Sequence, residues 1–218
     1  MSPQMIDRLW RALLDTVQMV GVSALIAAAL GVPLAVLLVL SQPGGLVAAP
    51  RLHRVLGAVV NGFRATPFIV LLVALIPFTR LITGTTIGVW AAIVPLSVSA
   101  TPFFARIAEV SLREVDRGLI EAAQAMGCRR RDIVRHVLIP EALPGLIGGF
   151  TVTVVTMIGA SAMAGAVGAG GLGDVAMRYG YQRFDTTVMA AVIAVLIALV
   201  CAVQFAGDLA VRRVRARR

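Results

Sequence analysis

Long apolar stretches without a charged side chain decide what this chain can fold into. A helix that crosses a bilayer needs about 20 consecutive, mostly apolar residues. Of the 218 residues, 59% are hydrophobic and only 14% are charged, which is far from the balance of a soluble domain. Charged residues are absent between Asp15 and Arg51, Arg64 and Arg80, Arg80 and Arg106, Glu141 and Asp174, and Asp185 and Asp208. The sequence therefore predicts an all-α integral membrane protein.

Each charge-free stretch fits one membrane-spanning helix. The stretch between Arg64 and Arg80 is short, so its helix must extend past an arginine. The first stretch is much longer than the about 7–15 apolar residues of a signal peptide, so we expect it to be retained as a helix. We predict one transmembrane domain over residues 1–218, with spans at about 17–40, 57–78, 86–108, 144–167 and 186–207.

The arginines predict how the chain is oriented in the membrane. All 20 basic residues are arginines, and the net charge is +9. Many follow the first, third and fifth spans, at Arg51 and Arg54, at Arg113, Arg117, Arg129, Arg130, Arg131 and Arg135, and at Arg212, Arg213, Arg215, Arg217 and Arg218. Because arginine-rich loops stay in the cytoplasm, we expect the N-terminus outside and the C-terminus inside, with a cytoplasmic loop over 113–143. This topology and anionic lipid account for the charge better than nucleic acid does.

The charged segment after the third span is predicted to form two short helices. Asp116 suits the N-cap of a helix over about 118–126. Gly127 suits its end, because glycine accepts the left-handed backbone conformation that terminates helices. A second helix is expected over about 132–138, with Pro140 breaking it.

The first of these helices has one narrow face of small and apolar side chains. Leu119, Ala122, Ala123 and Met126 recur on it at helical spacing. A linker lying on the membrane surface is the commoner fate of such an amphipathic segment. An alanine face beside Glu121, however, suits close packing against protein better than burial in lipid. The pattern favours a protein-binding knob, and the surface linker stays open as the alternative.

The same segment resembles the EAA loop of ABC-importer permeases. Glu121-Ala122-Ala123 is followed by three residues, Gly127, nine residues, and then Val137-Leu138-Ile139-Pro140. The family pattern has Ile and Leu where this chain has Val137 and Ile139, and both changes keep an apolar side chain. The Glu, the Gly and the Pro match the family pattern at the right spacing.

This resemblance implies a fold, partners and coupling residues. It implies the type I fold of ABC-importer permeases and a homodimer. The partners would be two ATPase subunits that hold ATP and Mg²⁺, and an extracytoplasmic solute-binding lipoprotein. The chain itself would bind no cofactor and would not be an enzyme. The loop would insert into a groove on the ATPase subunit, with coupling residues Glu121, Ala122, Ala123, Met126, Gly127 and Pro140.

Other segments resemble the methionine-importer branch of this family. They are FRATPFIVLL at 63–72, AAIVPL at 91–96, SAM at 161–163 with GAVGAGGLG at 165–173, and QFAGD at 204–208. The resemblance implies a bacterial inner-membrane permease for methionine, and both L- and D-methionine stay open as the transported enantiomer. Another amino acid, a phosphonate or an osmolyte stays open as the solute.

The translocation pathway is predicted from polar and conformationally special residues inside the spans. Polar groups in a membrane are costly and mark functional sites, and prolines kink helices. The candidates are Arg64, Thr66, Pro67, Pro95, Ser161 and Met163. Met163 is a candidate gate, because its flexible thioether lies in a span rich in small residues. Ordinary helix packing explains those small residues equally well, and extension to the membrane interface is the alternative for Arg64.

Other functional classes fit the sequence less well. The G-x-G-x-x-G pattern at 168–173 follows an apolar helix rather than a strand, so it is not a dinucleotide fingerprint. The chain has no G-x-x-x-x-G-K-[ST] motif, so a partner must handle ATP. His53 and His136 are isolated, and we expect loop residues rather than metal ligands. A secondary transporter would place carboxylates mid-membrane and a channel would need a filter; both are weaker alternatives.

Overall fold

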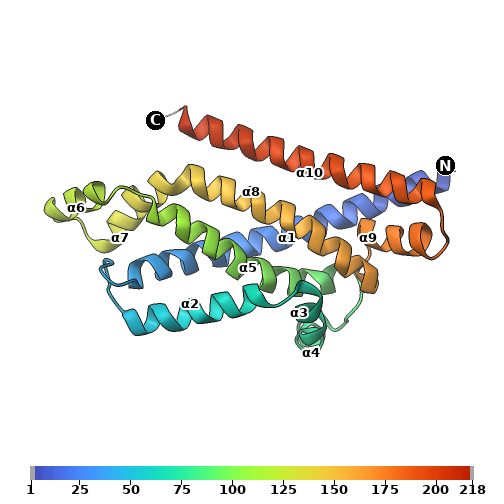
Figure 1. Cartoon of the computed structure of the whole chain (residues 1–218), viewed down its shortest axis with the longest axis horizontal. Helices are drawn as coiled ribbons and strands as arrows, with labels where there is room; N and C mark the ends of the chain where they lie inside the picture. The colour runs from blue at the N-terminus through green and yellow to red at the C-terminus, as the bar shows by residue number, and fades with distance from the viewer. Residues whose placement is uncertain (1–2, 217–218) are drawn as a thin grey trace.

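The computed structural model describes residues 3–216, and every regular element among them is a helix. Arg217 and Arg218 of the C-terminal arginine group lie outside the described residues. Figure 1 shows the elements in chain order, and η denotes a π-helical segment. They are α1 (Pro3–Ser41), α2 (Pro50–Ala65), α3 (Phe68–Ala74), α4 (Ile76–Thr83), α5 (Val89–Arg113), α6 (Arg117–Ala125), α7 (Arg130–Ile133), η1 (Val134–Leu138), α8 (Ile139–Ala164), η2 (Gly165–Ala169), α9 (Gly171–Val175), η3 (Ala176–Tyr181) and α10 (Thr186–Arg215).

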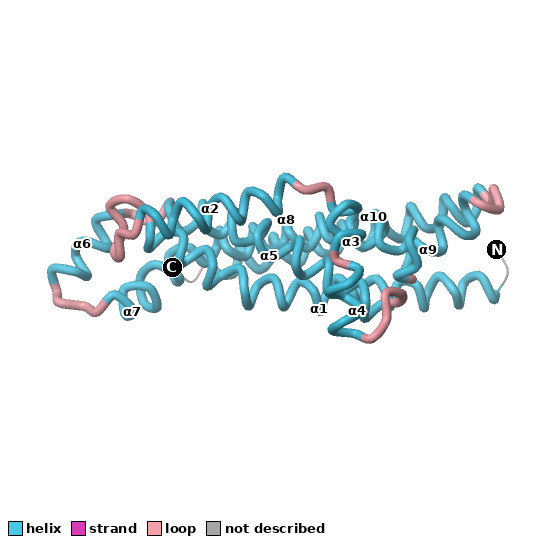
Figure 2. Tube along the Cα trace, turned by 90° about the horizontal axis from the view of Figure 1, so that it is seen from below, coloured by secondary structure: helices cyan, strands magenta, loops and turns pink. Residues whose placement is uncertain are grey.

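The long helices lie side by side in one elongated bundle, and its two ends differ (Figures 1 and 2). The N-terminus lies at one end with α9, and the C-terminus lies toward the other end with α6 and α7. By length and composition, four of the described helices can cross a membrane, or five if the bent pair α2–α3 counts as one span. The arginine-rich regions after α5 and at the end of α10 therefore lie toward the same end of the bundle.

Helix α5 forms the centre of the bundle and packs against α1, α8 and α2. Its contact with α1 consists largely of small side chains, such as Ala27 of α1 and Ala100 of α5. A Cβ added to Gly31 of α1 would meet Cδ1 of Phe104 at 2.8 Å. Small residues of this kind let two helix backbones approach closely in lipid. The α1–α5 pair is therefore a tightly packed core.

The span predicted near 57–78 is not one helix. Helix α2 ends at Ala65, α3 begins at Phe68, and the two are bent by 103°. Pro67 has no backbone N–H and disfavours helical backbone at Thr66, whose φ and ψ of −79° and 123° are extended. The break at Pro67 divides the predicted span into separate helices at a steep angle, α2 and α3.

Pro140 does not end the helix before it, contrary to prediction. It lies in the first turn of α8, directly after the π-helical η1, and the chain is helical on both sides. The wider π-helical turn before Pro140 lets the helix continue although the proline has no N–H to donate. The preceding helix also starts earlier than expected, at Arg130 rather than near residue 132.

The first helix starts well before the span predicted at 17–40. Helix α1 begins at Pro3, and its first turns pack against α9 and α10. Leu9 and Ala12 of α1 share a buried cluster with Leu172 of α9 and Val188 of α10. This contact stabilises turns of α1 that carry charged residues and lie outside the charge-free stretch.

The glycine-rich stretch at 168–173 forms a tight turn against α1. Gly171 has a φ of 74°, which favours glycine. A Cβ at this position would meet Oγ1 of Thr16 and Cε of Met19 at 2.7 Å. The backbone N–H of Leu172 donates to the same Oγ1 of Thr16 at 2.9 Å. These glycines allow a close approach of two segments of the chain.

Candidate functional site: the coupling segment and the pathway face

Helix α6 begins and ends where the sequence predicts. Oδ1 of Asp116 accepts a hydrogen bond from the backbone N–H of Gly118 at 2.6 Å, so Asp116 is the N-cap. Gly127 has a φ of 76° and reverses the chain. The N–H of Cys128 then donates to the carbonyl of Ala123 at 3.1 Å. These bonds fix a compact turn between α6 and α7.

The predicted apolar face of α6 is divided between the interior of the chain and its surface. Of the four predicted face residues only Ala123 is buried, and Ile120 packs beside it. Leu119, Ala122 and Met126 are exposed. Their i, i+3, i+7 spacing puts them on one side of the helix, and we call these three residues the exposed ridge. Part of the predicted face thus points away from the chain.

A buried apolar cluster anchors α6 to the bundle. It contains Leu112 of α5, Val115, Leu138 of η1 and Ala142 of α8, and Ile120 of α6 packs against it. The cluster therefore joins α6 to both of the long helices that flank it in sequence.

A hollow of about 390 Å³ lies between α6 and the loop that joins α1 to α2. Glu121 and Gln124 of α6 line it, together with Arg113 and Arg117. Among the described residues that line this hollow, Glu121 is the only carboxylate. Glu121 thus borders the hollow and does not belong to the exposed ridge, although both are on α6.

A buried carboxylate lies near the C-terminal end of α5. Glu109 of α5 is 1% exposed, and its oxygens lie 2.7 Å from a nitrogen of Arg106 and 2.5 Å from a nitrogen of Arg113. Glu109 was not among the predicted site residues, although the arginines at i−3 and i+4 were the signal available. Both arginines remain partly exposed to solvent. Only the carboxylate is fully buried, and its charge is paired with the two arginines.

The α2–α3 break places Arg64 and Thr66 close to α8. They line a pocket of about 80 Å³ together with Thr156 and Met157 of α8. Arg64 is exposed, and Oγ1 of Thr66 donates to the carbonyl of Gly62 at 3.0 Å. Two of the predicted pathway residues, from α2 and the α2–α3 break, are thus brought together beside a polar position of α8.

The structure does not bring Ser161 and Met163 together. Ser161 is 2% exposed, and its hydroxyl donates to the carbonyl of Ile158 at 2.7 Å. Met163 is 51% exposed. Residues two apart on an α-helix point about 200° apart, so these two cannot line one surface. Ser161 faces the packed interior of the chain.

Met163 shares its side of α8 with Thr156, which was not among the predicted pathway residues. Val152, Thr156, Gly159 and Met163 are all exposed and follow helical spacing. We call these four residues the exposed α8 face. Counting seven residues back from Met163 would have identified Thr156 from the sequence alone.

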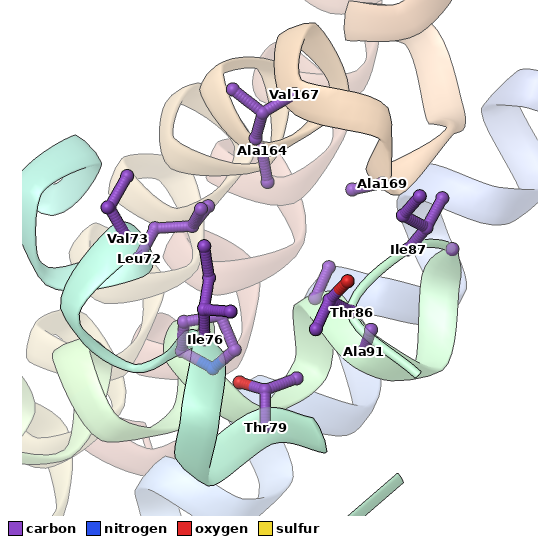
Figure 3. A pocket seen from close by; sticks show the side chains of 13 residues that line it. Leu72, Val73, Ile76, Thr79, Thr86, Ile87, Ala91, Ala164, Val167 and Ala169 are labelled. Atoms are coloured by element: carbon purple, nitrogen blue, oxygen red, sulfur yellow. The ribbon is translucent and has the colours of Figure 1, made fainter. Parts of the chain in front are cut away.

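Pro95 borders a different space. It lies inside α5, which continues through it, and it lines a pocket of about 240 Å³ between α3, α4, α5 and the end of α8 (Figure 3). Pro67 is instead the exposed N-cap of α3. The six predicted pathway residues are therefore divided among the α2–α3 break, this pocket, the exposed α8 face and the interior.

The two histidines lie in helices, and the prediction of loop positions was wrong. His53 belongs to α2 and His136 to η1. Their Nδ1 atoms lie 3.0 and 3.2 Å from the carbonyl oxygens of Leu38 and Asp132, respectively. Within residues 3–216, no group of three or more His, Cys, Asp or Glu side chains is placed to hold a metal ion.

Comparison with known proteins shows the family. Residues 31–216 match the family described as binding-protein-dependent transport system inner membrane component. The chain belongs to this family. The match includes the loop over 113–143, the α2–α3 break and the exposed α8 face. This inner-membrane transport component is a permease subunit rather than the ATPase of such a system.

Individual members of the family are similar to this chain over most of its length. The probable D-methionine transport system permease protein MetI of Vibrio cholerae is 52% identical over 208 residues, which are 95% of this chain and 92% of that protein. The methionine import system permease protein MetP of Bacillus subtilis is 45% identical over 175 residues, 79% of this chain and 78% of that protein.

A solved structure confirms the predicted ABC-importer permease fold. A chain of the inward facing MetNI methionine ABC transporter superposes with a TM-score of 0.97 at 51% identity. The superposition covers 98% of this chain and 99% of that chain. The broken span and the coupling segment are therefore part of a shared architecture.

Replacing Glu109 by Gln is expected to destabilise the protein. The change keeps the side-chain shape but leaves Arg106 and Arg113 without their shared carboxylate. Breaking a buried pair costs about 3–5 kcal/mol. Because both arginines reach water, we expect about 1–3 kcal/mol here. The loss should appear as a lower midpoint of thermal unfolding in detergent.

The exposed Glu114 provides the matched control. Glu114→Gln should leave the midpoint unchanged, because this side chain is in water before and after the change. A midpoint for Glu109→Gln equal to that of the wild type would contradict the stabilising role of the buried cluster.

Proposed function

We propose that this chain is the membrane-spanning permease subunit of an ATP-driven methionine importer. The observation that carries the proposal is the exposed ridge of α6, an apolar surface anchored to the bundle at its arginine-rich end. The solute is supported by the methionine permeases to which the chain is 52% and 45% identical.

The proposed orientation places α6, α7 and the C-terminus in the cytoplasm and the N-terminus outside. The arginines after α5 and at the end of α10 lie on one side of the bundle, as Figure 1 shows by the position of these elements. Retention of arginine-rich ends in the cytoplasm then assigns that side. The exposed ridge is consequently accessible to a cytoplasmic partner.

The exposed ridge suits a groove on an ATP-hydrolysing subunit. Leu119 and Met126 are 46% and 76% exposed, and burying such apolar surface in a partner is favourable. Methionine adapts its shape to the surface that receives it. The chain has no lysine and no phosphate-binding loop, so ATP and Mg²⁺ belong to the partner. The other proposed coupling residues, which lie outside the exposed ridge, are Glu121, Ala123, Gly127 and Pro140.

A second copy of the chain is proposed to complete the pathway. Asn61, Arg64 and Thr156 are exposed polar residues of α2 and α8. Inside a bilayer such groups need protein or water as a neighbour. Ile193 and Ile197 of α10 instead present an apolar face that suits lipid. The α2–α8 side therefore faces the second copy, and α10 faces the membrane.

The mechanism follows from how α6 is attached. Closure of two ATPase subunits on ATP moves the two coupling segments, and the cluster around Leu112 and Leu138 passes the motion to α5 and α8. The helices rock as bodies and the pathway opens outward, where an external binding protein delivers the solute. Hydrolysis reopens the pathway toward the cytoplasm.

Vesicles that contain this chain, its ATPase subunit and its binding protein should accumulate labelled methionine only when ATP is supplied. Both L- and D-methionine are tested, since the relatives include a D-methionine permease. Vesicles without the binding protein are the control and should show little uptake. Uptake of another amino acid, a phosphonate or an osmolyte in place of methionine would contradict the assigned solute. Uptake without ATP would contradict the importer.

Replacing Met126 by Glu should weaken the complex with the ATPase subunit at least about tenfold, because a carboxylate is costly to bury in an apolar groove. The measurement is copurification of the two subunits, together with methionine uptake by vesicles. Met126→Leu keeps an apolar side chain and should retain both. Met126→Glu that copurifies as well as Met126→Leu would contradict the role of the exposed ridge.

A further inference from the structure

An apolar pocket of about 240 Å³ lies in the half of the bundle away from α6. Figure 3 shows that its walls come from separate segments, with Leu72 of α3, Ile76 of α4, Ile87 of the following loop and Val167 of η2 arranged around one space. Ala91 of α5 lies at the same space. The pocket is thus formed by segments on both sides of the α4–α5 loop.

The lining of the pocket fits an uncharged, apolar group. Thr79 and Thr86 contribute hydroxyl-bearing side chains, and the other lining residues are apolar or glycine. Among the described residues that line it, none is charged. An ammonium or carboxylate group placed here would lose its hydration without an ion partner, which is costly. The pocket therefore suits a hydrocarbon or thioether and excludes the charged ends of an amino acid.

The pocket has the size of one amino-acid side chain. An apolar cavity of about 150 Å³ holds a six-carbon ring such as benzene. A volume of about 240 Å³ consequently accommodates an unbranched thioether side chain with room at its end. Burial of each methylene group in such a space is favourable by about 0.8 kcal/mol.

The rim of the pocket lies where the proposed pathway passes. Val73 and Val167 are 55% and 50% exposed, and Ala164, which directly follows Met163 of the exposed α8 face, also lines the pocket. The backbone N–H of Gly88 donates to the carbonyl of Gly168 at 3.1 Å, which ties the α4–α5 loop to η2 across the rim. A solute on the exposed α8 face is therefore next to this pocket.

We propose that this pocket is a subsite for the apolar side chain of the transported amino acid, whose ammonium and carboxylate groups stay in the aqueous pathway. The inference rests on the proposed function and names a part of that pathway. It has a consequence for selectivity: the subsite discriminates side-chain length and polarity, and it does not discriminate the configuration at Cα.

Opposite changes in pocket size test the subsite. Ala91→Leu fills the space and Ile76→Ala enlarges it. Uptake of ethionine, which is one methylene longer than methionine, is compared with methionine uptake by the same vesicles. We expect Ala91→Leu to lower the ethionine-to-methionine ratio about tenfold and Ile76→Ala to raise it, because one methylene in an apolar pocket changes selectivity by about tenfold or more.

The matched control is Ala194→Leu, the same change on the exposed surface of α10, which should leave the ratio unchanged. The same binding protein delivers both solutes, so its own preference cancels when each variant is compared with the wild type. A ratio that stays constant in both pocket variants would overturn the subsite. If both pocket variants lost uptake of methionine and ethionine to the same extent and also lost the dimer, the second copy would be filling the pocket. That result would overturn the subsite as well.

Protection of a cysteine separates this inference from the proposed function. Ile76→Cys is introduced into a chain whose Cys128 and Cys201 are changed to Ser, and maleimide labelling is followed in the purified complex. Ethionine should slow labelling at this position and leave labelling of Ile193→Cys unchanged. Protection without methionine uptake by wild-type vesicles would contradict the proposed function alone. Uptake without protection would contradict the subsite.

Discussion

The close contact between α1 and α5 is the constraint on which the rest of the structure depends. Two helices in lipid gain little from hydrophobic burial, so they associate through close packing and hydrogen bonds. Gly31 leaves room for Phe104, and the hydroxyl of Ser23 donates to the carbonyl of Ile93 at 3.3 Å. Helix α5 stays continuous although it contains Pro95. It therefore acts as a stiff element that α2, α8 and the coupling segment pack against.

Both functional regions of the chain meet α5. Near its C-terminal end, Glu109 forms ion pairs with Arg106 and Arg113, and Leu112 belongs to the cluster that anchors α6. Near its N-terminal end, Ala91 and Pro95 line the apolar pocket. Helix α5 is continuous between these ends, although Pro95 and Pro102 lie inside it, so it links the anchor of α6 directly to the pocket. The geometry thus connects the proposed site of ATPase contact to the proposed site of solute passage.

Some features follow from sequence because they depend on local chemistry, and others do not. The charge-free runs predict the long helices, and Asp116 with Gly127 predicts α6. Pro67 was ambiguous, since a proline either kinks a helix or ends it, and the surrounding packing decides. The continuation of the helix through Pro140 depends on the π-helical turn before it, which no residue pattern indicates. Which side of α6 faces outward depends on the packing of Ile120 against the cluster that includes Leu138 of η1, and the pattern of residues in α6 alone does not indicate this contact. The opposite sides of Ser161 and Met163, by contrast, follow from helical geometry.

The central claim is that α6, α5 and α8 move as one body when the ATPase subunits close. The test is the distance between two spin labels, measured by pulsed electron paramagnetic resonance. One label is at Arg129, in the exposed turn after α6, and the other is at Val152 on the exposed α8 face. The account predicts that the distance between the two labels within one chain is the same without nucleotide and with ATP. It also predicts that the Arg129 distance between the two copies changes. A within-chain distance that changes while the distance between copies stays fixed would contradict the account.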